Sequence, residues 1–362
     1  MNAVKIAKKI VPESGLLYLK TVNRNRKKTG EFINNLILLL VGTSPLLSSL
    51  YYAFISPQFR REHHAVIKGK LAYNKSLKSS NNNYYQLRRN IHRLEKGLIM
   101  KPRRDVFALD YIEETVQNYS QLVKENANPL QNQDLNWAHD VLNEYFKVTG
   151  SNPVIEKSKT IFLSVNPLNQ ELNRIPYLRD NKPLSISYEE FLELCYRRRS
   201  VRWYEQKPVP RELIDKAIIA ASLSPSACNR QPFEFRVFDE PELVKQVSSI
   251  PGGTKGFAHN FPMIIVVIGQ LKAYFSERDR HVIYIDASLA SMSLMYGLEI
   301  LGLSSCPINW PDVDEFENKM KSLLNLTDDE RPIMLISVGF PDNQGLVPYS
   351  QKKILEKLRR YN

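Results

Sequence analysis

The chain has 362 residues, of which 43% are hydrophobic, and it carries a formal net charge of +12. This composition supports a sizeable core in one large domain or two of ordinary size, and it excludes an intrinsically disordered chain. The three cysteines, Cys195, Cys228 and Cys306, form no CxxC pair and show no zinc-site spacing, which argues against a disulfide framework and against a metal site. We therefore expect a reducing, cytoplasmic setting.

The positive charge is concentrated in the first 104 residues, which hold 21 Lys and Arg against 4 Asp and Glu. The remaining 258 residues hold 29 basic and 34 acidic side chains, so this larger part of the chain is mildly acidic. Neither part shows a recognisable nucleic-acid-binding module with interleaved aromatic residues. We therefore expect no nucleic-acid partner.

An uncharged and strongly apolar run extends from residue 32 to residue 59, with basic residues on both sides. Its length would admit a transmembrane helix, but Asn34 and the break between Gly42 and Pro45 interrupt it, and two positive flanks do not fit a single span. A second interpretation is a monotopic segment through which residues 1–104 bind an anionic membrane surface, peripherally on its inner face. A third is a helical hairpin that packs on the rest of the protein.

The apolar periodicity of the next part of the chain predicts helices rather than strands. We expect helices over residues 84–95, 105–124 and 135–148, and a connector over residues 150–187, which contain four prolines. Gly97 is expected to end the first helix in a left-handed conformation. His92 and Glu95 share a helix face, and we interpret them as a surface pair, because two such side chains do not make a metal site.

From residue 187 onward, helical and strand patterns alternate. Ser187 opens a helix through a capping box, Pro210 begins the next, and a long helix over residues 286–301 carries many small residues that permit close approach of a second helix, in the same chain or in a partner subunit. Strands are predicted from their β-branched and aromatic content over residues 233–238, 263–268 and 333–338. This pattern predicts an α+β domain of α/β layers.

The chain is thus divided into three parts. Residues 1–60 form a basic segment with the apolar run, residues 61–186 a helical extension with its connector, and residues 187–362 the layered domain. The sequence contains no Walker A loop, no GxGxxG and no GxSxG motif. A P-loop NTPase, an NAD-dependent Rossmann dehydrogenase and an α/β-hydrolase are therefore disfavoured.

A cluster of arginines at residues 197–202 is the most distinctive chemical feature of the layered domain. Arginine presents a rigid fork of donors that suits phosphate, and Ser200 adds a short neutral donor, so the cluster is typical of an anion site. A solvated basic helix end is the alternative. Three further polar loops, over residues 224–233, 306–310 and 349–353, are expected to carry ligand-binding residues.

These segments, in this order, resemble the FMN-dependent nitroreductase family. The motifs are RRSVRWY from Arg198, SPSACNRQPFEF from Ser224, GLSSCPINW from Gly302, and VGFP from Val338 followed by a basic tail. The resemblance covers residues 188–353 and implies a nitroreductase-like central β-sheet flanked by helices, with a mostly helical N-terminal extension. Residues 60–110 also resemble the extension of nitroreductase-like proteins associated with polysaccharide biosynthesis.

The resemblance implies FMN as cofactor, NADH or NADPH as electron donor, a small-molecule substrate, and a homodimer with FMN at its interface. No catalytic side chain is implied, because the flavin carries the chemistry. In the opening motif it places the phosphate, the ribityl chain and the pyrimidine ring at Arg198, Ser200 and Arg202 respectively. The remaining implied cofactor-binding residues, of which the first five cover the flavin of the other subunit, are Pro225, Ser226, Ala227, Asn229, Gln231, Pro307, Ile308, Asn309, Trp310, Lys352 and Lys353.

Two departures from the family pattern affect these expectations. Many relatives have Gly or Glu where this chain has Asn309 and Trp310, so the bulky indole is expected to narrow the substrate side. Arg197 and Arg199 are expected to face solvent or acidic neighbours rather than the cofactor.

The resulting hypothesis is an FMN-dependent oxidoreductase that uses reduced nicotinamide on an acceptor and is linked to cell-envelope polysaccharide biosynthesis. The alternative is a non-catalytic FMN-binding or interaction protein of a membrane-associated polysaccharide assembly. Anaerobic bleaching by reduced nicotinamide distinguishes the two, because only the enzyme passes electrons to its flavin.

Overall fold

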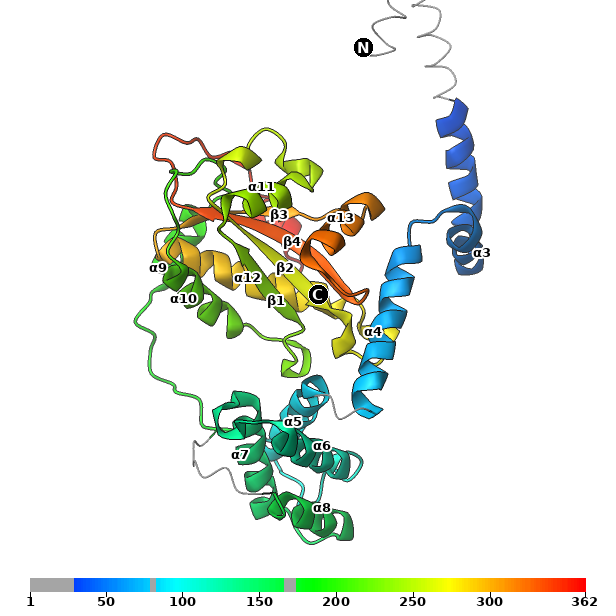
Figure 1. Cartoon of the computed structure of the whole chain (residues 1–362), viewed down its shortest axis with the longest axis vertical. Coiled ribbons are helices and arrows are strands. Elements are labelled where there is room, and N and C mark those ends of the chain that lie inside the picture. Colours follow the sequence, from blue (N-terminus) through cyan, green and yellow to red (C-terminus); the bar gives the residue numbers. More distant parts are fainter. Residues whose placement is uncertain (1–28, 79–82, 166–173) are drawn as a thin grey trace, which may run out of the picture. The chain divides into compact units, whose positions relative to one another are not determined.

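The computed structural model describes residues 29–78, 83–165 and 174–362, and the chain divides into two units, Met1–His63 and His64–Asn362 (Figure 1). The basic residues before position 29, on which part of the membrane-surface interpretation depends, lie outside the described residues.

In the first unit, the apolar run forms short helical segments. Residues 29–41 are helical, α3 spans Pro45–Leu50, and the π-helical turn η1 spans Tyr51–Ile55. The Ser44 side chain caps α3 by accepting a hydrogen bond from Leu47 N–H at 3.2 Å, and Pro45 occupies its first turn, so the predicted break is confirmed.

Large apolar side chains of this unit are exposed, including Leu39 at 72% and Phe54 at 77%, and none of residues 29–59 is buried. The apolar run of residues 32–59 therefore contributes no buried side chain to a hydrophobic core. Among the described residues, no helix combines the length and the hydrophobicity needed to cross a bilayer.

The second unit begins within α4, Arg60–Lys78, and continues through the helical extension. The extension has a core of its own, in which Ile91, Ile112, Leu135 and Ile155 are among the buried side chains. Its helices are α5 Tyr84–Leu98, α6 Ile112–Glu125, α7 Gln133–Val148 and α8 Pro153–Leu163, with a short 3-10 turn, η2, at Pro129–Gln131.

Three expectations for the extension are wrong. Residues 105–111 are not helical, and α8 lies inside the predicted connector, because Asn152 caps it and Pro153 takes the first helical position, where proline is tolerated. Gly97 does not end α5. It lies within that helix, where a Cβ would come within 2.2 Å of the Phe107 ring, so close packing explains the glycine.

The layered domain is built on a four-stranded antiparallel sheet with the order β1-β2-β4-β3 (Figure 1). Strand β2 pairs with β1 through Val266 and Arg236, and with β4 through Val266 and Leu335. The predicted α+β class is confirmed. The strands are β1 Phe233–Phe238, β2 Met263–Gln270, β3 Ser304–Asn309 and β4 Glu330–Gly339.

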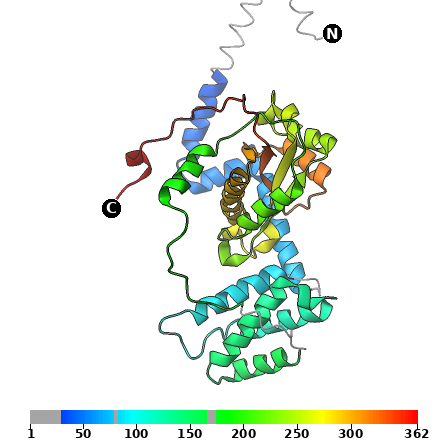
Figure 2. The same ribbon diagram turned by 90° about the vertical axis from the view of Figure 1, so that its left-hand side faces the viewer.

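Helices cover both faces of the sheet. Met263, Ile265 and Val267 of β2 face a core shared with α10 and α12, whereas Ile264 and Val266 face a core shared with α11 and α13. Figure 2 shows the same layers from the side. The α-helices of this domain are α9 Tyr188–Arg197, α10 Arg211–Ser222, α11 Pro241–Ser249, α12 Val282–Ile300, α13 Asp314–Leu324 and α14 Leu355–Leu358.

Short 3-10 turns connect these elements. They are η3 Ala227–Asn229, η4 Gly252–Thr254, η5 Ala258–Asn260, η6 Leu271–Ala273 and η7 Glu277–Asp279. The turn η3 contacts α5, and a Cβ on Gly69 of α4 would meet the Leu271 Cβ of η6 at 2.7 Å. The extension and the layered domain therefore pack together within the second unit.

The small residues of α12 are used largely within the chain. Gly297 lies against Ala217 of α10, where a Cβ would stand 3.3 Å from the Ala217 Cα. Ala287 and Ala290 are buried in the core that α12 shares with the sheet. Close approach of a second helix was expected from the sequence, and α10 provides it.

Candidate functional site

The arginine cluster begins where α9 ends. The N–H of Arg198 donates to Leu194 O at 3.0 Å and closes the helix, and Arg198 itself adopts an extended conformation. Ser200 then forms a parallel bridge with Ser305, and Val201 N–H donates to Ser305 O at 3.1 Å. Residues 198–202 therefore run along the outer edge of β3, the edge strand of the sheet.

Arg198, Ser200 and Arg202 all lie close to Cys306, the third residue of β3. Burial raises the pKa of the Cys306 thiol, and Arg202, Ser200 and Arg198 act in the opposite direction. Arg202 donates to Ser200 O at 3.2 Å, and its guanidinium lies 5.6 Å from the centre of the Phe257 ring. The three predicted residues of the opening motif are thus brought together at one place.

A buried hydroxyl on the neighbouring residue of β3 lacks a partner. Ser305 is 1% exposed, and its Oγ has no hydrogen-bond partner within the described parts of the chain. Buried hydroxyls without partners are uncommon, because their desolvation is not compensated. The alternation along β3 turns this hydroxyl to the opposite face from Cys306, so the site itself combines two guanidiniums and the Ser200 hydroxyl at a strand edge.

The other two arginines of the cluster have partners within the chain. Arg197 Nε lies 3.3 Å from Glu299 Oε1, with the arginine side chain 68% exposed and the glutamate side chain 8% exposed. Arg199 donates to the backbone oxygens of Cys195 and Arg198 at 3.2 and 3.1 Å. Arg197 therefore faces an acidic neighbour, as expected, while Arg199 stabilises the end of α9.

The loop of residues 224–231 is fastened to α12 by Asp286. The carboxylate oxygen Oδ2 accepts hydrogen bonds from Ser226 Oγ at 2.8 Å and from Ala227 N–H at 2.9 Å. Gln231 N–H donates to the same Ser226 hydroxyl at 2.8 Å. One buried carboxylate thus organises both ends of the loop through a single serine.

The backbone of this loop is held in an uncommon conformation. Cys228, Asn229 and Gln231 have φ values of 53°, 51° and 49°, in the left-handed region that non-glycine residues seldom occupy. Such conformations persist where surrounding contacts over-determine them, and they are frequent at ligand-binding loops. Hydrogen bonds from the surrounding residues, rather than the intrinsic preferences of the loop residues, therefore hold the loop in this conformation.

Helix α5 of the extension also holds this loop. Arg88 donates from Nε to Asn229 O at 2.7 Å and from Nη2 to Gln231 Oε1 at 2.9 Å. The amide of Gln231 in turn donates to Ser222 O at 2.7 Å. The side chains of Ser226 and Gln231, predicted to bind the cofactor, thus have structural partners in their own chain, and Pro225, Ala227 and Asn229 belong to the same loop.

The third predicted segment, expected to be a loop, is a strand. Residues Ser304–Asn309 pair with β4 as β3, and Pro307 is accommodated because β3 is an edge strand. The side chains of Pro307 and Asn309 are exposed, whereas Ile308 is buried. Pro307 and Asn309 therefore border the same strand edge as the arginine cluster.

Trp310 is placed differently from our expectation. Its indole is 8% exposed, packs in the core beneath the sheet, and donates from Nε1 to Glu317 Oε1 at 2.8 Å. The expectation that the indole narrows the substrate side is therefore wrong, because the alternation along β3 turns this side chain into the core.

The two predicted lysines lie in the C-terminal tail. Lys352 and Lys353 are exposed, and in Figure 2 the tail extends away from the sheet. Among the described residues, the contacts of the arginine cluster include neither lysine. The structure does not bring these lysines to the cluster.

Two residues that support the loop of residues 224–231 could not be found from the family pattern. Asp286 is one of only two acids in the strongly apolar α12, and a signal of this kind indicates a buried carboxylate with specific partners. Arg88 carries no such signal, because its partners Asn229 and Gln231 come from a distant segment of the chain. Asp286 and Arg88 both hold the loop of residues 224–231, and neither belongs to the motifs of the family pattern.

Comparisons with known proteins identify the family to which the chain is similar. The profile of the Nitroreductase family matches residues 196–250 and 241–340. A protein of Archaeoglobus fulgidus named "Putative NADH dehydrogenase/NAD(P)H nitroreductase" is 33% identical over 160 residues, which cover 43% of this chain and 88% of the relative. Iodotyrosine deiodinase 1 of Pongo abelii is 26% identical over 223 residues, covering 52% of this chain and 75% of that protein.

Among solved structures, an FMN-dependent nitroreductase of Clostridium difficile R20291 is similar at 28% identity and a TM-score of 0.41. The match covers 47% of this chain and 98% of that one. The Archaeoglobus relative is matched over most of its length, and the matched profile begins at the arginine cluster and ends just after β4. The chain therefore belongs to the nitroreductase family.

Proposed function

We propose that this protein is an FMN-dependent oxidoreductase that takes electrons from reduced nicotinamide and passes them to a small-molecule acceptor. The observation that carries the proposal is the gathering of Arg198, Ser200 and Arg202 beside the outer edge of β3. Family membership supports an oxidoreductase, and the names of two similar proteins include NAD(P)H and FMN.

The residues at this place suit a flavin mononucleotide. Arg198 would hold the phosphate, because a guanidinium matches phosphate oxygens with paired donors. Ser200 would meet the ribityl hydroxyls. When bound, FMN supplies the ability to accept a hydride from nicotinamide and to deliver it to an acceptor.

Arg202 would act electrostatically on the ring. A cation near the pyrimidine carbonyls stabilises the negative charge that accompanies reduction, and the half-buried position of Arg202 limits the screening of this interaction by solvent. The exposed positions of β3, Pro307 and Asn309, would border the ring through their backbone. Lys352 and Lys353 would reach the phosphate only after the tail folds back.

We further propose that the protein is a homodimer in which the loop of residues 224–231 covers the flavin of the other subunit. Exposed apolar side chains on α9 and α12 support an interface. They include Phe191 at 48%, Ile285 at 50%, Leu289 at 43% and Ile300 at 70%. Large apolar side chains on several helices of one domain commonly mark a subunit interface.

The first unit is proposed to bind an anionic membrane surface through residues 29–55, as a peripheral rather than a spanning segment. The support is the exposure of its apolar side chains, whose burial in a leaflet would remove them from water. The link with polysaccharide biosynthesis rests on the resemblance of residues 60–110 alone.

Anaerobic reduction tests the redox proposal. The purified full-length protein, reconstituted with FMN, should lose its flavin absorbance near 450 nm when NADH or NADPH is added without oxygen, roughly as free flavin does on chemical reduction. Bound flavin that dithionite bleaches but neither nicotinamide bleaches would contradict the proposal and favour the non-catalytic alternative.

A further inference from the structure

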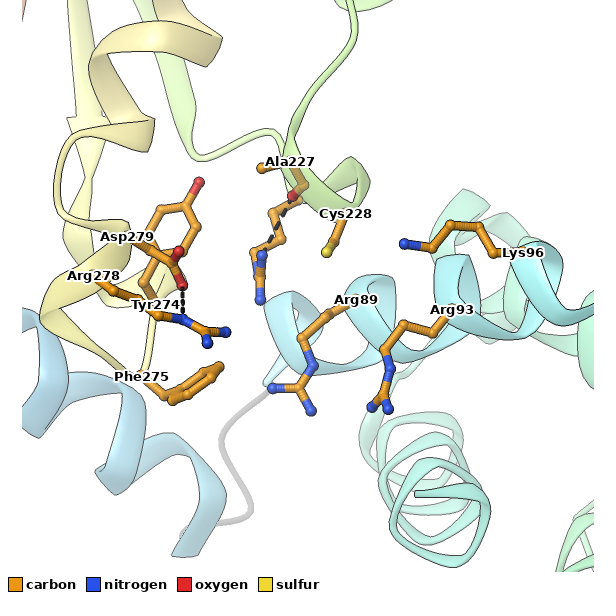
Figure 3. Close-up of a pocket in the computed structure, with 10 residues that line it drawn as sticks. Arg89, Arg93, Lys96, Ala227, Cys228, Tyr274, Phe275, Arg278 and Asp279 are labelled. Atoms are coloured by element: carbon orange, nitrogen blue, oxygen red, sulfur yellow. Dashed lines mark hydrogen bonds and ion pairs between the residues drawn. The ribbon is translucent and has the colours of Figure 1, made fainter. Parts of the chain in front are cut away.

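A cavity of about 480 Å³ lies between the extension and the layered domain, apart from the arginine cluster (Figure 3). Helix α5 forms one wall, η3 with Arg230 forms a second, and the segment from Tyr274 to Asp279 forms a third. We call it the α5 cavity. Its volume lies in the range of small-molecule sites.

The walls of this cavity are fixed by contacts within the second unit. Arg88 of α5 is hydrogen-bonded to Asn229 and Gln231 on the second wall. Tyr85 of α5 donates to the side chain of Gln270, which ends the strand leading to the third wall. The cavity therefore does not depend on a mobile contact between the extension and the domain.

Positive charge dominates the lining. It contains five cationic side chains and a single carboxylate, Asp279, and Figure 3 shows the amino end of Lys96 directed toward Cys228. The cationic residues are Arg89, Arg93, Lys96, Arg230 and Arg278.

Three of these cations have carboxylate partners, and the pairs are open to solvent. Arg93 lies 3.1 Å from Asp110, Arg89 lies 3.7 Å from Glu114, and Arg278 lies 3.5 Å from Asp279. Partly exposed pairs of this kind hold side chains weakly and leave them able to meet another anion. Arg230 and Lys96 form no ion pair within the part of the chain that the structure describes.

Aromatic rings position these cations without neutralising them. The guanidiniums of Arg89 and Arg278 lie 5.5 and 5.3 Å from the centre of the Phe275 ring. The guanidinium of Arg230 lies 5.0 Å from the Tyr274 ring. A ring face attracts a cation but accepts little of its charge, so the donors remain available.

Two buried polar groups at the inner end of the cavity lack partners. Arg230 is 5% exposed, and its Nε is unsatisfied, while Nη1 makes only a 3.4 Å contact with Ala227 O. Tyr274 is 2% exposed, and its hydroxyl is also unsatisfied among the described residues. Burial raises the pKa of Tyr274, so the hydroxyl is a donor at neutral pH. A buried guanidinium with an unsatisfied Nε, beside a buried hydroxyl without a partner, offers two donors suited to an anion, although the Asp286 carboxylate offsets part of the arginine's charge.

We propose that the α5 cavity binds a small molecule carrying a phosphate monoester or diphosphate group, with Arg230 and Tyr274 as the inner donors. A single carboxylate would match one guanidinium and leave the remaining donors unused, whereas phosphate oxygens accept from several donors in different directions. Lys96, Arg89, Arg93 and Arg278 would meet the outer oxygens. Binding here does not require the redox reaction.

Calorimetric titration of the full-length protein with inorganic pyrophosphate tests the proposal. We expect binding that weakens as the salt concentration rises, and a thermal shift on addition of pyrophosphate. Arg230→Met should weaken binding at least tenfold. Without pyrophosphate the variant should remain folded with only a small change in Tm, because replacing a buried charge by an apolar chain offsets the loss of its attraction for the Asp286 carboxylate.

The double variant Lys96→Gln/Arg278→Gln changes only rim side chains and keeps the test decisive if Arg230→Met does not fold. It should weaken pyrophosphate binding about tenfold. The control Lys216→Gln/Lys245→Gln, at exposed positions of α10 and α11, likewise removes two positive charges and should bind as the wild type does. The absence of pyrophosphate binding, or equal affinity in the wild type and Lys96→Gln/Arg278→Gln, would overturn the proposal.

A phosphate site could also belong to FMN, and competition separates the two sources. Pyrophosphate should bind with unchanged affinity to protein saturated with FMN, and Arg230→Met should retain FMN. If FMN displaces pyrophosphate and Arg230→Met loses FMN, the cavity is a flavin phosphate site and the proposal of a separate ligand is wrong. Failure of FMN binding with intact pyrophosphate binding would refute the proposed function alone.

Discussion

Asp286→Ala removes the carboxylate that fastens the loop of residues 224–231 to α12. Two hydrogen bonds are lost, from Ser226 Oγ at 2.8 Å and Ala227 N–H at 2.9 Å. Bonds to a charged acceptor contribute about 1.5 kcal/mol each at the lower end, and the cost of burying the carboxylate offsets part of this. We expect the free energy of unfolding to fall by about 2 kcal/mol, and Tm by about 4–8 °C.

The matched control is Asp286→Asn, whose side-chain oxygen can still accept both bonds. It should retain the free energy of unfolding to within about 1 kcal/mol. Hydrogen exchange read by mass spectrometry should show faster exchange in peptides over residues 224–231 for Asp286→Ala only. Equal loss in both variants, or unchanged exchange in Asp286→Ala, would refute the role of the carboxylate.

The wild type and Asp286→Asn together test how the Asp286 carboxyl titrates. Burial raises the pKa of Asp286, while Ser226, Ala227 and Arg230 favour the charged form. Between the ordinary and the raised pKa the folded state binds more protons than the unfolded state, so the stability of the wild type falls as pH rises through this window. The stability of Asp286→Asn relative to the wild type should therefore rise with pH from about pH 4 and then become constant. A constant difference, or one that falls with pH, would contradict this.

Three further predictions concern packing and the membrane. Gly97→Ala should lower the free energy of unfolding by about 1–3 kcal/mol, because its Cβ would overlap the Phe107 ring, and an unchanged denaturant midpoint would show that α5 packs otherwise. Trp310→Phe should lower the free energy of unfolding by about 1 kcal/mol, because the hydrogen bond to Glu317 is lost, and should leave the KM for an acceptor unchanged. A changed KM would indicate that the indole contacts the substrate. Leu39→Ser/Leu40→Ser should abolish co-sedimentation with phosphatidylglycerol vesicles, while Leu346→Ser/Leu358→Ser should not; equal sedimentation of the wild type and both variants would refute the membrane proposal.

The strands with strong local signals could be predicted, and the one without them could not. β1, β2 and β4 are rich in β-branched and aromatic residues, and all three were expected. β3 has the sequence SSCPIN, with one β-branched residue and a proline, and it is a strand because β4 supplies a complete pairing edge. Pairing with β4, rather than the local sequence of residues 304–309, therefore makes this segment a strand.

Helix boundaries, too, could be predicted only where the sequence carries a local signal. The capping box at Ser187 was visible in the sequence and is present, with both reciprocal hydrogen bonds. Gly97 and Pro153 were interpreted as helix breakers, yet one lies within α5 and the other begins α8. Gly97 is explained by the Phe107 ring, which approaches from outside the helix and leaves no local trace in the sequence.

The candidate site could be predicted where its residues lie close together in the sequence. Residues 198–202 form one cluster because they are a single short stretch of chain that runs alongside β3. The support of the loop over residues 224–231 could not be predicted, since it comes from Arg88, 141 positions before Asn229, and from Asp286 on α12. The α5 cavity is missing from the family pattern for the same reason: one of its walls belongs to the extension.

Titration of the apoprotein with FMN, followed by quenching of flavin fluorescence, tests the central claim most directly. We predict saturable binding of FMN by the wild type, at least tenfold weaker binding by Arg202→Ala, and nearly unchanged binding by Arg197→Ala, because Arg197 pairs with Glu299 instead. The absence of flavin binding by the wild type would contradict the account, as would a greater loss in Arg197→Ala than in Arg202→Ala.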